Sequence, residues 1–519
     1  MLKKIVSIFS VFIMLLVFLY HNDSFYSKIK DSRFVRLSDD IVNEFNVARM
    51  IHQKDVFPND YVDLILSGDD LKHISSSMKL FIGESYIRDQ INPWRKAKVI
   101  VDGQKEKVKY KFHGTDARYM SARRPFLDKL KLKLGLGDVH SVSPVSAGTF
   151  SLKIKHKKNS HYYQLMRRYK LINPYDNHEI STTIINTIAS KIGLMAPHGR
   201  TVILRINGSE IGAYMLVEAH NKEWFERVHQ LTNYTVFSST DDWDRKVRAH
   251  YSDTDLYIQN KKIRTISEHA PVATGALELL LKSIKSGDIE QIKRMIDVDY
   301  MAKYMALLAI TNDSHPVTGD NLRYVYNHAT GRFKLLFRQE VATVPNNLDI
   351  DEFNSSFFSR EDAIGIDIDT FKLFKLLLTD SNFLTKRDEE LNKIVQNNSQ
   401  WRVLTDEIVA ENMRVFLASK ISIRPIEFKI DKFKENFENN IEKARKYLNY
   451  SKIFITKYTD INGKKSLRFI NDFVHPVSLS KILKLDNENK LKSENTNIFI
   501  KPSQLDINQK IIYKEQIID

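Results

Sequence analysis

Three side chains between residues 311 and 340 are of the types that phosphoryl transfer uses. An apolar run ends at Thr311, and the polar loop that follows contains Asp313 and Asn321. A strand–turn–strand pattern then leads to Glu340. Phosphoryl transfer needs one carboxylate to orient the attacking hydroxyl, and an Asn and an acid to hold Mg²⁺ on the phosphates. Because a hairpin brings the chain back to the end from which it started, we expect Asn321 and Glu340 at one end of it.

Each of these residues also has a purely structural interpretation. Asp and Asn are common turn formers, so Asp313 and Asn321 are also consistent with an ordinary loop after a helix. Glu340 is equally typical of an exposed acid at the end of a strand. Arg338 lies two residues before it, and a cation beside a metal site weakens divalent binding electrostatically. The spacing alone therefore leaves both interpretations open.

Earlier in the chain, Lys153 and Lys155 alternate with apolar residues on a predicted strand. A lysine there could contact nucleotide phosphates as a point charge, or it could belong to a solvated strand face. Glu218 ends an apolar strand and could meet an adenine or a lysine, or pair with Lys222 at the surface. Glu179 could pair with a strand lysine or simply close a helix-capping box.

Several classes of site are absent from the sequence. The chain of 519 residues has no cysteine, which excludes disulfides, thiolate metal sites and cysteine nucleophiles. It has no His-Glu-x-x-His zinc motif, no Walker phosphate loop, no Gly-x-Ser-x-Gly elbow and no dinucleotide-binding fingerprint. Common hydrolase and nucleotide-binding motifs therefore do not account for the candidates above.

The N-terminus and the overall charge predict location and partners. Residues 1–20 have a basic start and then an apolar run without a small-residue cleavage signature, which favours an uncleaved signal anchor with the rest exported. A cleaved signal peptide is the alternative. The net charge of +15 indicates an anionic glycan, phosphate or membrane partner, or only a solvated basic surface. Without a zinc-finger or helix-turn-helix signature, we expect no nucleic acid partner.

The elements that would position these residues follow from periodicity and turn signals. Asp102-Gly103 and Asn207-Gly208 predict two β-hairpins. A helix with a capping box over 176–179 lies between them in the sequence and ends at Gly193. The other predicted helices are 275–286, 289–295, 300–310, 370–378, 382–396 and 425–448. We expect a signal anchor or transmembrane segment over 1–28, a stalk over 29–60, a β-rich part over 61–270, a helical part over 271–450 and a small β-rich tail over 451–519.

The order of these segments resembles the CotH kinase family, the atypical kinases named for spore-coat protein H. The most specific stretch is 204–218, an apolar strand, Asn-Gly, and then Gly-x-Tyr-x-Leu-x-Glu. The strand 150–155, the Asn312-Asp313 pair and the segment 337–340 add to it. The resemblance covers roughly residues 94–448.

This resemblance implies an α+β, atypical protein-kinase-like fold that uses ATP and Mg²⁺ or Mn²⁺. By position, Asp313 would be the catalytic carboxylate, and Asn321 and Glu340 would hold the metal. Lys153 or Lys155 would contact phosphate, and Glu218 would lie near the nucleotide-binding hinge.

The activity implied is transfer of the ATP γ-phosphate to a protein or glycan hydroxyl outside the cytoplasm. The chain departs from the family at 337–340, where members commonly have Trp-Asp-x-Asp and this chain has Arg338 and Glu340 in place of the acids. The alternative is therefore a catalytically impaired pseudokinase or scaffold in cell-envelope or surface-polysaccharide assembly.

Overall fold

The structure is a computed structural model, and it combines helices and sheets, as the sequence predicts. The residues that it describes are 51–81, 93–113, 150–158, 160, 162–173, 180–239, 256–258, 264–312, 315–317, 322–338, 368–419, 424–449, 453–459, 465–471, 477–485, 491–500, 504–505, 511–512 and 515–518.

Seven strands form a closed barrel in the order β1-β2-β3-β4-β5-β7-β6. The strands are β1 Tyr61–Ile65, β2 Arg95–Val101, β3 Gln104–Phe112, β4 Leu152–His156, β5 Arg168–Ile172, β6 Gly199–Ile206 and β7 Ser209–Glu218. Antiparallel pairs build the sheet, and the parallel pair β1–β6, in register at Tyr61↔Ile203, closes it. The sequence did not predict this closure, because pairing between strands so far apart leaves no local periodicity.

Both hairpin predictions in the barrel are confirmed. Asp102 and Gly103 have φ values of 49° and 78°, and Asn207 and Gly208 have 52° and 82°. Positive φ at both central residues is the type I′ geometry, which matches the right-handed twist of the flanking strands. Alternation then places apolar side chains inside the barrel, where Val99, Leu152 and Leu204 are fully buried.

The helical part packs around a second hydrophobic core. Its helices are α7 Ile180–Lys191, α8 Lys222–His229, α10 Arg264–Ser286, α11 Ile289–Met295, α12 Val298–Thr311, α14 Ile368–Thr379, α15 Ser381–Gln396, α16 Asn398–Ala418 and α17 Arg424–Asn449. A four-stranded sheet in the order β11-β10-β8-β9 lies among them, with β8 Tyr234–Ser239, β9 Leu256–Ile258, β10 Arg323–Asn327 and β11 Arg332–Leu335.

Helix α7 is buried along nearly its whole length. It contacts β6 of the barrel and both α16 and α17. The helix ends as predicted at Gly193, whose φ is 91°. Its predicted capping box at 176–179, including Glu179, lies outside the described residues.

Some helices were missed or misplaced by sequence analysis. Helix α10 begins at Arg264 and not at Gly275, and it contains Pro271 within its span. The sequence also failed to predict α8, α16 and a helix α5 over Gly68–Phe81. In α16 the buried stripe includes Thr405 and Asn412 at helical spacing, and polar residues in the stripe obscure the amphipathic pattern.

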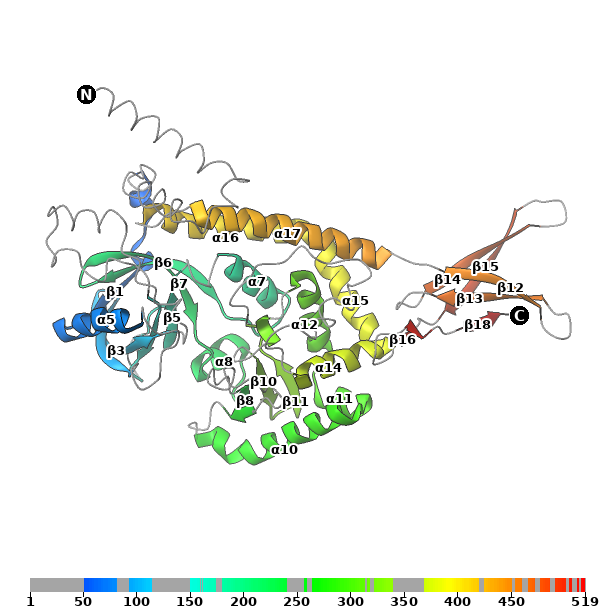
Figure 1. Ribbon diagram of the computed structural model, residues 1–519, viewed down its shortest axis with the longest axis horizontal. Helices are drawn as coiled ribbons and strands as arrows, with labels where there is room; N and C mark the ends of the chain where they lie inside the picture. The colour runs from blue at the N-terminus through cyan, green and yellow to red at the C-terminus, as the bar shows by residue number, and fades with distance from the viewer. Residues whose placement is uncertain are drawn as a thin grey trace, which may run out of the picture.

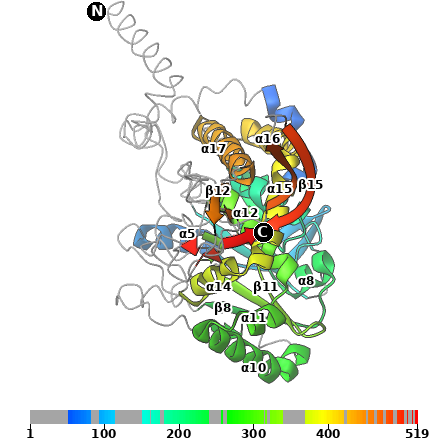
Figure 2. The same ribbon diagram turned by 90° about the vertical axis from the view of Figure 1, so that its right-hand side faces the viewer.

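Helices α16 and α17 run together along one side of the molecule, from the barrel to the helical part (Figure 1). The view turned by 90° places α10 on the opposite side, with α12 and β11 between (Figure 2). Strands of the C-terminal tail lie beyond the end of α17 (Figure 1). They are β12 Ile453–Thr459, β13 Lys465–Asn471, β14 Val477–Leu485, β15 Leu491–Ile500, β16 Gln504–Leu505, β17 Ile511–Ile512 and β18 Glu515–Ile518.

In the tail, β12 and β13 form an antiparallel pair. Within the described residues, no helix is long and apolar enough to cross a membrane. The predicted anchor, residues 1–28, is not among the residues searched.

A buried ion-pair network attaches α16 to the barrel. Arg414 of α16 donates to both carboxylate oxygens of Asp60, at 2.7 and 3.2 Å, and Arg200 of β6 donates to the same group at 3.2 Å. Beside it, Asn412 accepts hydrogen bonds from the backbone N–H and the hydroxyl of Thr201, both at 2.7 Å. We call this set, Asp60, Arg200, Thr201, Asn412 and Arg414, the α16 clamp.

Burial acts to raise the pKa of Asp60, but hydrogen bonds from Arg414 and the Phe57 backbone, with the charges of Arg414 and Arg200, outweigh it and lower the pKa. We therefore expect Asp60→Ala to destabilise the fold by about 2–4 kcal/mol, because two partly buried guanidinium groups lose their anion. The exposed pair Arg402–Glu438 supplies the control, and Arg402→Ala should destabilise the fold far less than Asp60→Ala does, because water screens the pair.

Urea unfolding of both variants measures this difference. The contribution of Asp60 is present above its ordinary pKa near 3.8 and is lost as the pH falls through the lowered value. Equal free energies of unfolding for the two variants at neutral pH would show that the clamp contributes no more than a surface pair.

Candidate functional site

Helix α12 ends where the predicted catalytic loop begins. Its C-cap is Asn312, which adopts the left-handed conformation with φ 46° and donates its N–H to the Leu308 carbonyl at 2.8 Å. Asn312 is buried, and its side-chain Nδ2 has no hydrogen-bond partner among the described residues. A buried amide without a partner is costly, so this position calls for an acceptor from the adjoining loop or from a ligand.

The predicted hairpin after this loop is confirmed. β10 and β11 are antiparallel with Tyr324 opposite Leu335, and the Leu336 N–H donates to the Arg323 carbonyl at 3.0 Å. The chain that enters β10 and the chain that leaves β11 therefore meet at one end of the hairpin. Leu322 and Phe337, which flank the hairpin there, are completely buried.

The segment that leaves β11 runs along α12. The Tyr300 hydroxyl donates to the Leu335 carbonyl at 2.6 Å, and the Tyr304 ring lies 5.5 Å from the ring of Phe337. The Phe337 N–H donates to the Met195 carbonyl, just beyond α7, at 2.8 Å. Successive residues of this segment thus meet successive turns of α12, so the chain heads toward the helix end at Asn312.

The three predicted acid and amide residues, Asp313, Asn321 and Glu340, lie outside the described residues. The structure fixes the chain on either side of them and does not place their side chains. Arg338, the last described residue before Glu340, is only 8% exposed. Within the described part of the chain, no group of three His, Asp or Glu side chains could hold a metal ion.

The predicted lysines lie on the outer face of the barrel. Lys153 and Lys155 are half-buried on β4 and alternate with interior residues, as their pattern predicts. In the register, Lys153 lies opposite Lys170 and Lys155 lies opposite Arg168 on β5. The strand β5 separates both predicted lysines from β7, which ends at Glu218.

Lys170 is a further candidate, which sequence analysis did not consider. It lies directly opposite Val217 on β7, one position from Glu218, whereas Lys153 and Lys155 are one strand further away. The alternation Arg168-Tyr-Lys-Leu-Ile172 could have identified it, since it marks a half-exposed strand just before α7. The resemblance of residues 150–155 to the CotH family pointed instead to the lysines of the neighbouring strand, β4.

Glu218 is buried at the C-terminal end of β7, where the chain passes into α8. Its partner is Arg227 of α8, and the surface pairing with Lys222 that the sequence left open was wrong, since Lys222 pairs with Glu226 at 3.3 Å. Burial raises the pKa of Glu218, and the hydrogen bond and charge of Arg227 oppose this without cancelling it. The side chain therefore lies at the junction between the barrel and the helical part.

A family model described as CotH kinase protein matches residues 146–474, which is more than half of the chain. The chain belongs to the CotH kinase family. The match begins later than the resemblance seen in the sequence, so β1, α5, β2 and β3 lie before it, and it extends beyond α17 to include β12 and β13. A comparison with curated proteins found no match.

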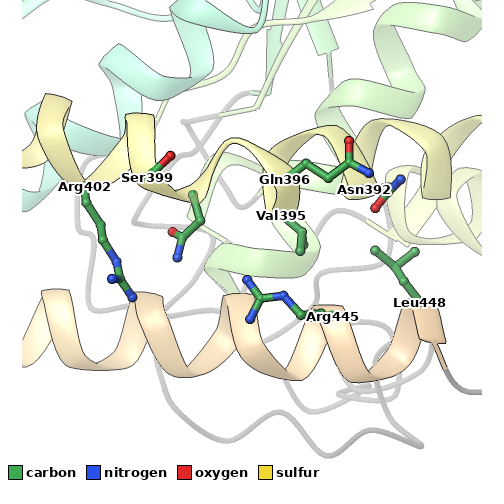
Figure 3. Close-up of a pocket in the computed structure, with 8 residues that line it drawn as sticks. Asn392, Val395, Gln396, Ser399, Arg402, Arg445 and Leu448 are labelled. Carbon is green, nitrogen blue, oxygen red and sulfur yellow. The ribbon is translucent and has the colours of Figure 1, made fainter.

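A polar pocket of about 510 Å³ lies between α17 and the junction of α15 with α16 (Figure 3). None of the candidate site residues described above lines it. Figure 3 shows Ser399 and Arg402 on one helix and Arg445 on the facing helix. Arg402 donates to Glu438 at 2.6 and 2.5 Å, and Arg445 pairs with Glu442. Because these cations already have anionic partners, the pocket is a weak candidate for an anionic substrate.

The raised pKa of Glu218 predicts a specific pH dependence. The folded carboxyl holds its proton to higher pH than the unfolded one, so the stability of the wild type should fall as pH rises from about 4 through the raised value. Glu218→Gln removes this dependence, while Arg227, whose side chain is 39% exposed, remains hydrated.

Urea unfolding between about pH 4 and pH 7 measures the difference between wild type and Glu218→Gln. The control is Glu226→Gln on α8, the helix that also carries Arg227; it removes an exposed pair and should change stability by less than about 1 kcal/mol at any pH. A constant difference between wild type and Glu218→Gln across this range would contradict the assignment.

Proposed function

We propose that this CotH kinase family member is a phosphotransferase that moves the γ-phosphate of ATP to a hydroxyl of a protein or glycan, with Mg²⁺ or Mn²⁺. The observation that supports this most is that the segment leaving the β10–β11 hairpin packs along α12, with the Tyr300 hydroxyl on the Leu335 carbonyl and the Tyr304 ring beside Phe337, within the region that the family model matches. In the sequence, Asp313 follows the end of α12, Asn321 precedes β10 and Glu340 follows β11.

In this proposal the barrel, with α7, is the nucleotide-binding lobe of a kinase-like fold, and the helical part is the second lobe. Glu218 lies on the connection between them. Lys170, supported by Lys153 and Lys155, provides positive charge for the phosphates at the strand next to this connection. The domain boundaries at 61–270, 271–450 and 451–519 belong to the same proposal.

The bound nucleotide would supply the phosphoryl group, and the divalent cation would neutralise charge on its oxygens. Asp313 would orient the acceptor hydroxyl, and Asn321 and Glu340 would be the oxygen ligands of the cation. The buried Nδ2 of Asn312 fits such a site, because it leaves one donor beside Asp313 for an acceptor in the loop or ligand.

Arg338 supports the alternative of a catalytically impaired CotH scaffold. A buried guanidinium stands where family members commonly have the first acid, and it opposes a divalent cation held by Glu340. In that case the chain would retain nucleotide or partner binding and act in assembly of the cell envelope or surface polysaccharide. For either activity we propose a membrane-anchored, extracytoplasmic location, on the basis of residues 1–28.

The test of the proposed function is transfer of label from γ-labelled ATP by the full chain, to itself and to casein, with Mg²⁺ or Mn²⁺. We expect label with the wild type and a loss of about 100-fold or more in Asp313→Asn, because the acceptor hydroxyl loses its orienting carboxylate. Asp406→Asn, an exposed acid of α16 paired with Lys434, is the control and should remain active.

The possible negative results distinguish the alternatives. Absence of label combined with a rise in melting temperature on adding ATP would contradict catalysis and favour the impaired scaffold. Absence of both would contradict nucleotide binding as well, and would favour an envelope protein whose basic surface holds an anionic glycan.

A second prediction concerns the choice of lysine. Lys170→Met should raise the dissociation constant for ATP about tenfold or more, because Lys170 lies beside the end of β7, while Lys105→Met at the far end of the β2–β3 hairpin should have little effect. Equilibrium binding of a fluorescent ATP analogue provides the measurement. If Lys153→Met weakens binding and Lys170→Met does not, the phosphates bind nearer β4.

A further inference from the structure

The outer face of the barrel carries lysines that the proposed kinase chemistry does not use. On β2 and β3 successive side chains alternate between the interior and the outer face. Lys98 lies directly opposite Lys107, and Lys96 lies directly opposite Lys109. These four lysines are exposed, whereas Val108 between Lys107 and Lys109 is buried, so the lysines share the outer face of the hairpin.

The arrangement continues onto the neighbouring strand. Lys157, just beyond β4, donates its N–H to the Lys107 carbonyl at 3.3 Å, and Lys109 lies opposite Lys155 of β4. The lysines thus form two rows across the strands, and their backbone positions are roughly 5 Å apart within a row and roughly 7 Å apart between rows. We call the five exposed members the lysine lattice: Lys96, Lys98, Lys107, Lys109 and Lys157.

The protein itself does not neutralise this lattice. In the part of the chain that the structure describes, no lysine of the lattice forms a salt bridge. Glu106, the one acid of β2 and β3, lies opposite the buried Val99 and therefore on the other face. On β1, Asp63 already pairs with Arg205 at 3.8 Å. Like charges directly opposite each other destabilise a sheet, so the lattice has a cost that a bound anion would offset.

An exposed tryptophan lies beside the lattice. Trp94 directly precedes β2 and is 40% exposed, and the Lys111 Nζ lies 5.6 Å from the centre of its ring. Lys111 alternates with buried residues of β3 and shares the outer face with Lys107 and Lys109, so the indole lies on the lattice side of the barrel. A flat aromatic side chain with a polar edge, next to cations, offers a surface on which a sugar ring can stack.

The surroundings of the lattice argue against other anionic partners. The barrel is closed, so β2, β3 and β4 have no free edge to which an acidic peptide could add as a further strand. One tryptophan is not the series of stacking aromatic side chains that single-stranded nucleic acid uses. Ile100 is the only apolar residue on this face of β2 and β3, whereas elements that bind membrane surfaces place many apolar side chains beside their cations.

We propose that the lysine lattice binds a linear acidic glycan, a polymer with a carboxylate on each sugar, and that Trp94 stacks on one of its rings. A pyranose residue is about as long as the separation of neighbouring strands, roughly 5 Å, so successive carboxylates can meet successive lysines along a row. The lattice would hold such a chain whether or not the protein transfers phosphate. The proposal therefore does not depend on the kinase activity.

The test is calorimetric titration of the full chain with an oligogalacturonate of defined length, at low ionic strength. Lys98→Gln combined with Lys107→Gln should weaken binding about tenfold or more, because two contacts with carboxylates are lost. This variant should fold at least as stably as the wild type, since it removes a like-charge pair. The control removes two exposed lysines of α10, with Lys282→Gln and Lys285→Gln, and should bind as the wild type does.

Trp94→Ala separates recognition of the sugar from recognition of charge. Loss of the stacking surface should weaken oligogalacturonate binding about fivefold and leave the binding of polyglutamate of the same charge unaffected. Raising the salt concentration from about 0.1 M to about 1 M shortens the screening length from roughly 10 Å to roughly 3 Å, so binding by the wild type should weaken steeply. A neutral maltooligosaccharide should not bind.

Four results would overturn the proposal. One is equal weakening of polyglutamate and oligogalacturonate in the lysine variant with no effect of Trp94→Ala, which would indicate a surface for any anion. Another is tighter binding of oligothymidylate than of oligogalacturonate, which would indicate nucleic acid. The third is binding of phosphatidylglycerol vesicles, lost in the lysine variant, without binding of the glycan. The fourth is no binding of oligogalacturonate at low salt. Label transfer to casein by these variants reports separately on the kinase proposal.

Discussion

The α16 clamp is the interaction on which the relative position of the two cores depends. The barrel and the helical part have separate hydrophobic clusters, and hydrophobic contact alone is non-directional. The bidentate Arg414–Asp60 pair and the Thr201–Asn412 hydrogen bonds fix one orientation of α16 on the barrel. Because α16 and α17 also pack on α7, the clamp sets where the lysine strands lie relative to the end of α12.

Within the helical part, the chain segments around the candidate site pack along α12. Tyr300 connects α12 to both chains beside it, since its hydroxyl donates to Leu335 and accepts from the Met195 N–H at 2.9 Å. Burial raises the pKa of Tyr300 far above the physiological range, so this hydroxyl keeps its proton and its donor role. The hairpin exit is thereby held beside the helix that ends at Asn312, through buried groups that water does not reach.

The sequence was informative wherever the determinant is local. Asp102-Gly103 and Asn207-Gly208 specify their turns by backbone preference, and Gly193 ends its helix for the same reason. Barrel closure, the Asp60–Arg414 pair and the position of Lys170 between β4 and β7 depend on contacts between distant segments, which leave no periodic signal. For the candidate site, the sequence correctly predicted the β10–β11 hairpin that brings its two ends together, while Asp313, Asn321 and Glu340 lie outside the described residues.

The charge of the barrel is distributed unevenly over its outer face. On the outer face, Ile172, Met215 and Val217 pack into the helical core, whereas β2, β3 and β4 present lysines to solvent. Lys170 lies at the border, with Lys153 on one side and Val217 on the other. An anion approaching this border experiences the field of the whole lysine face, which falls off over roughly 10 Å at moderate salt. This field therefore raises the local concentration of phosphates near Lys170.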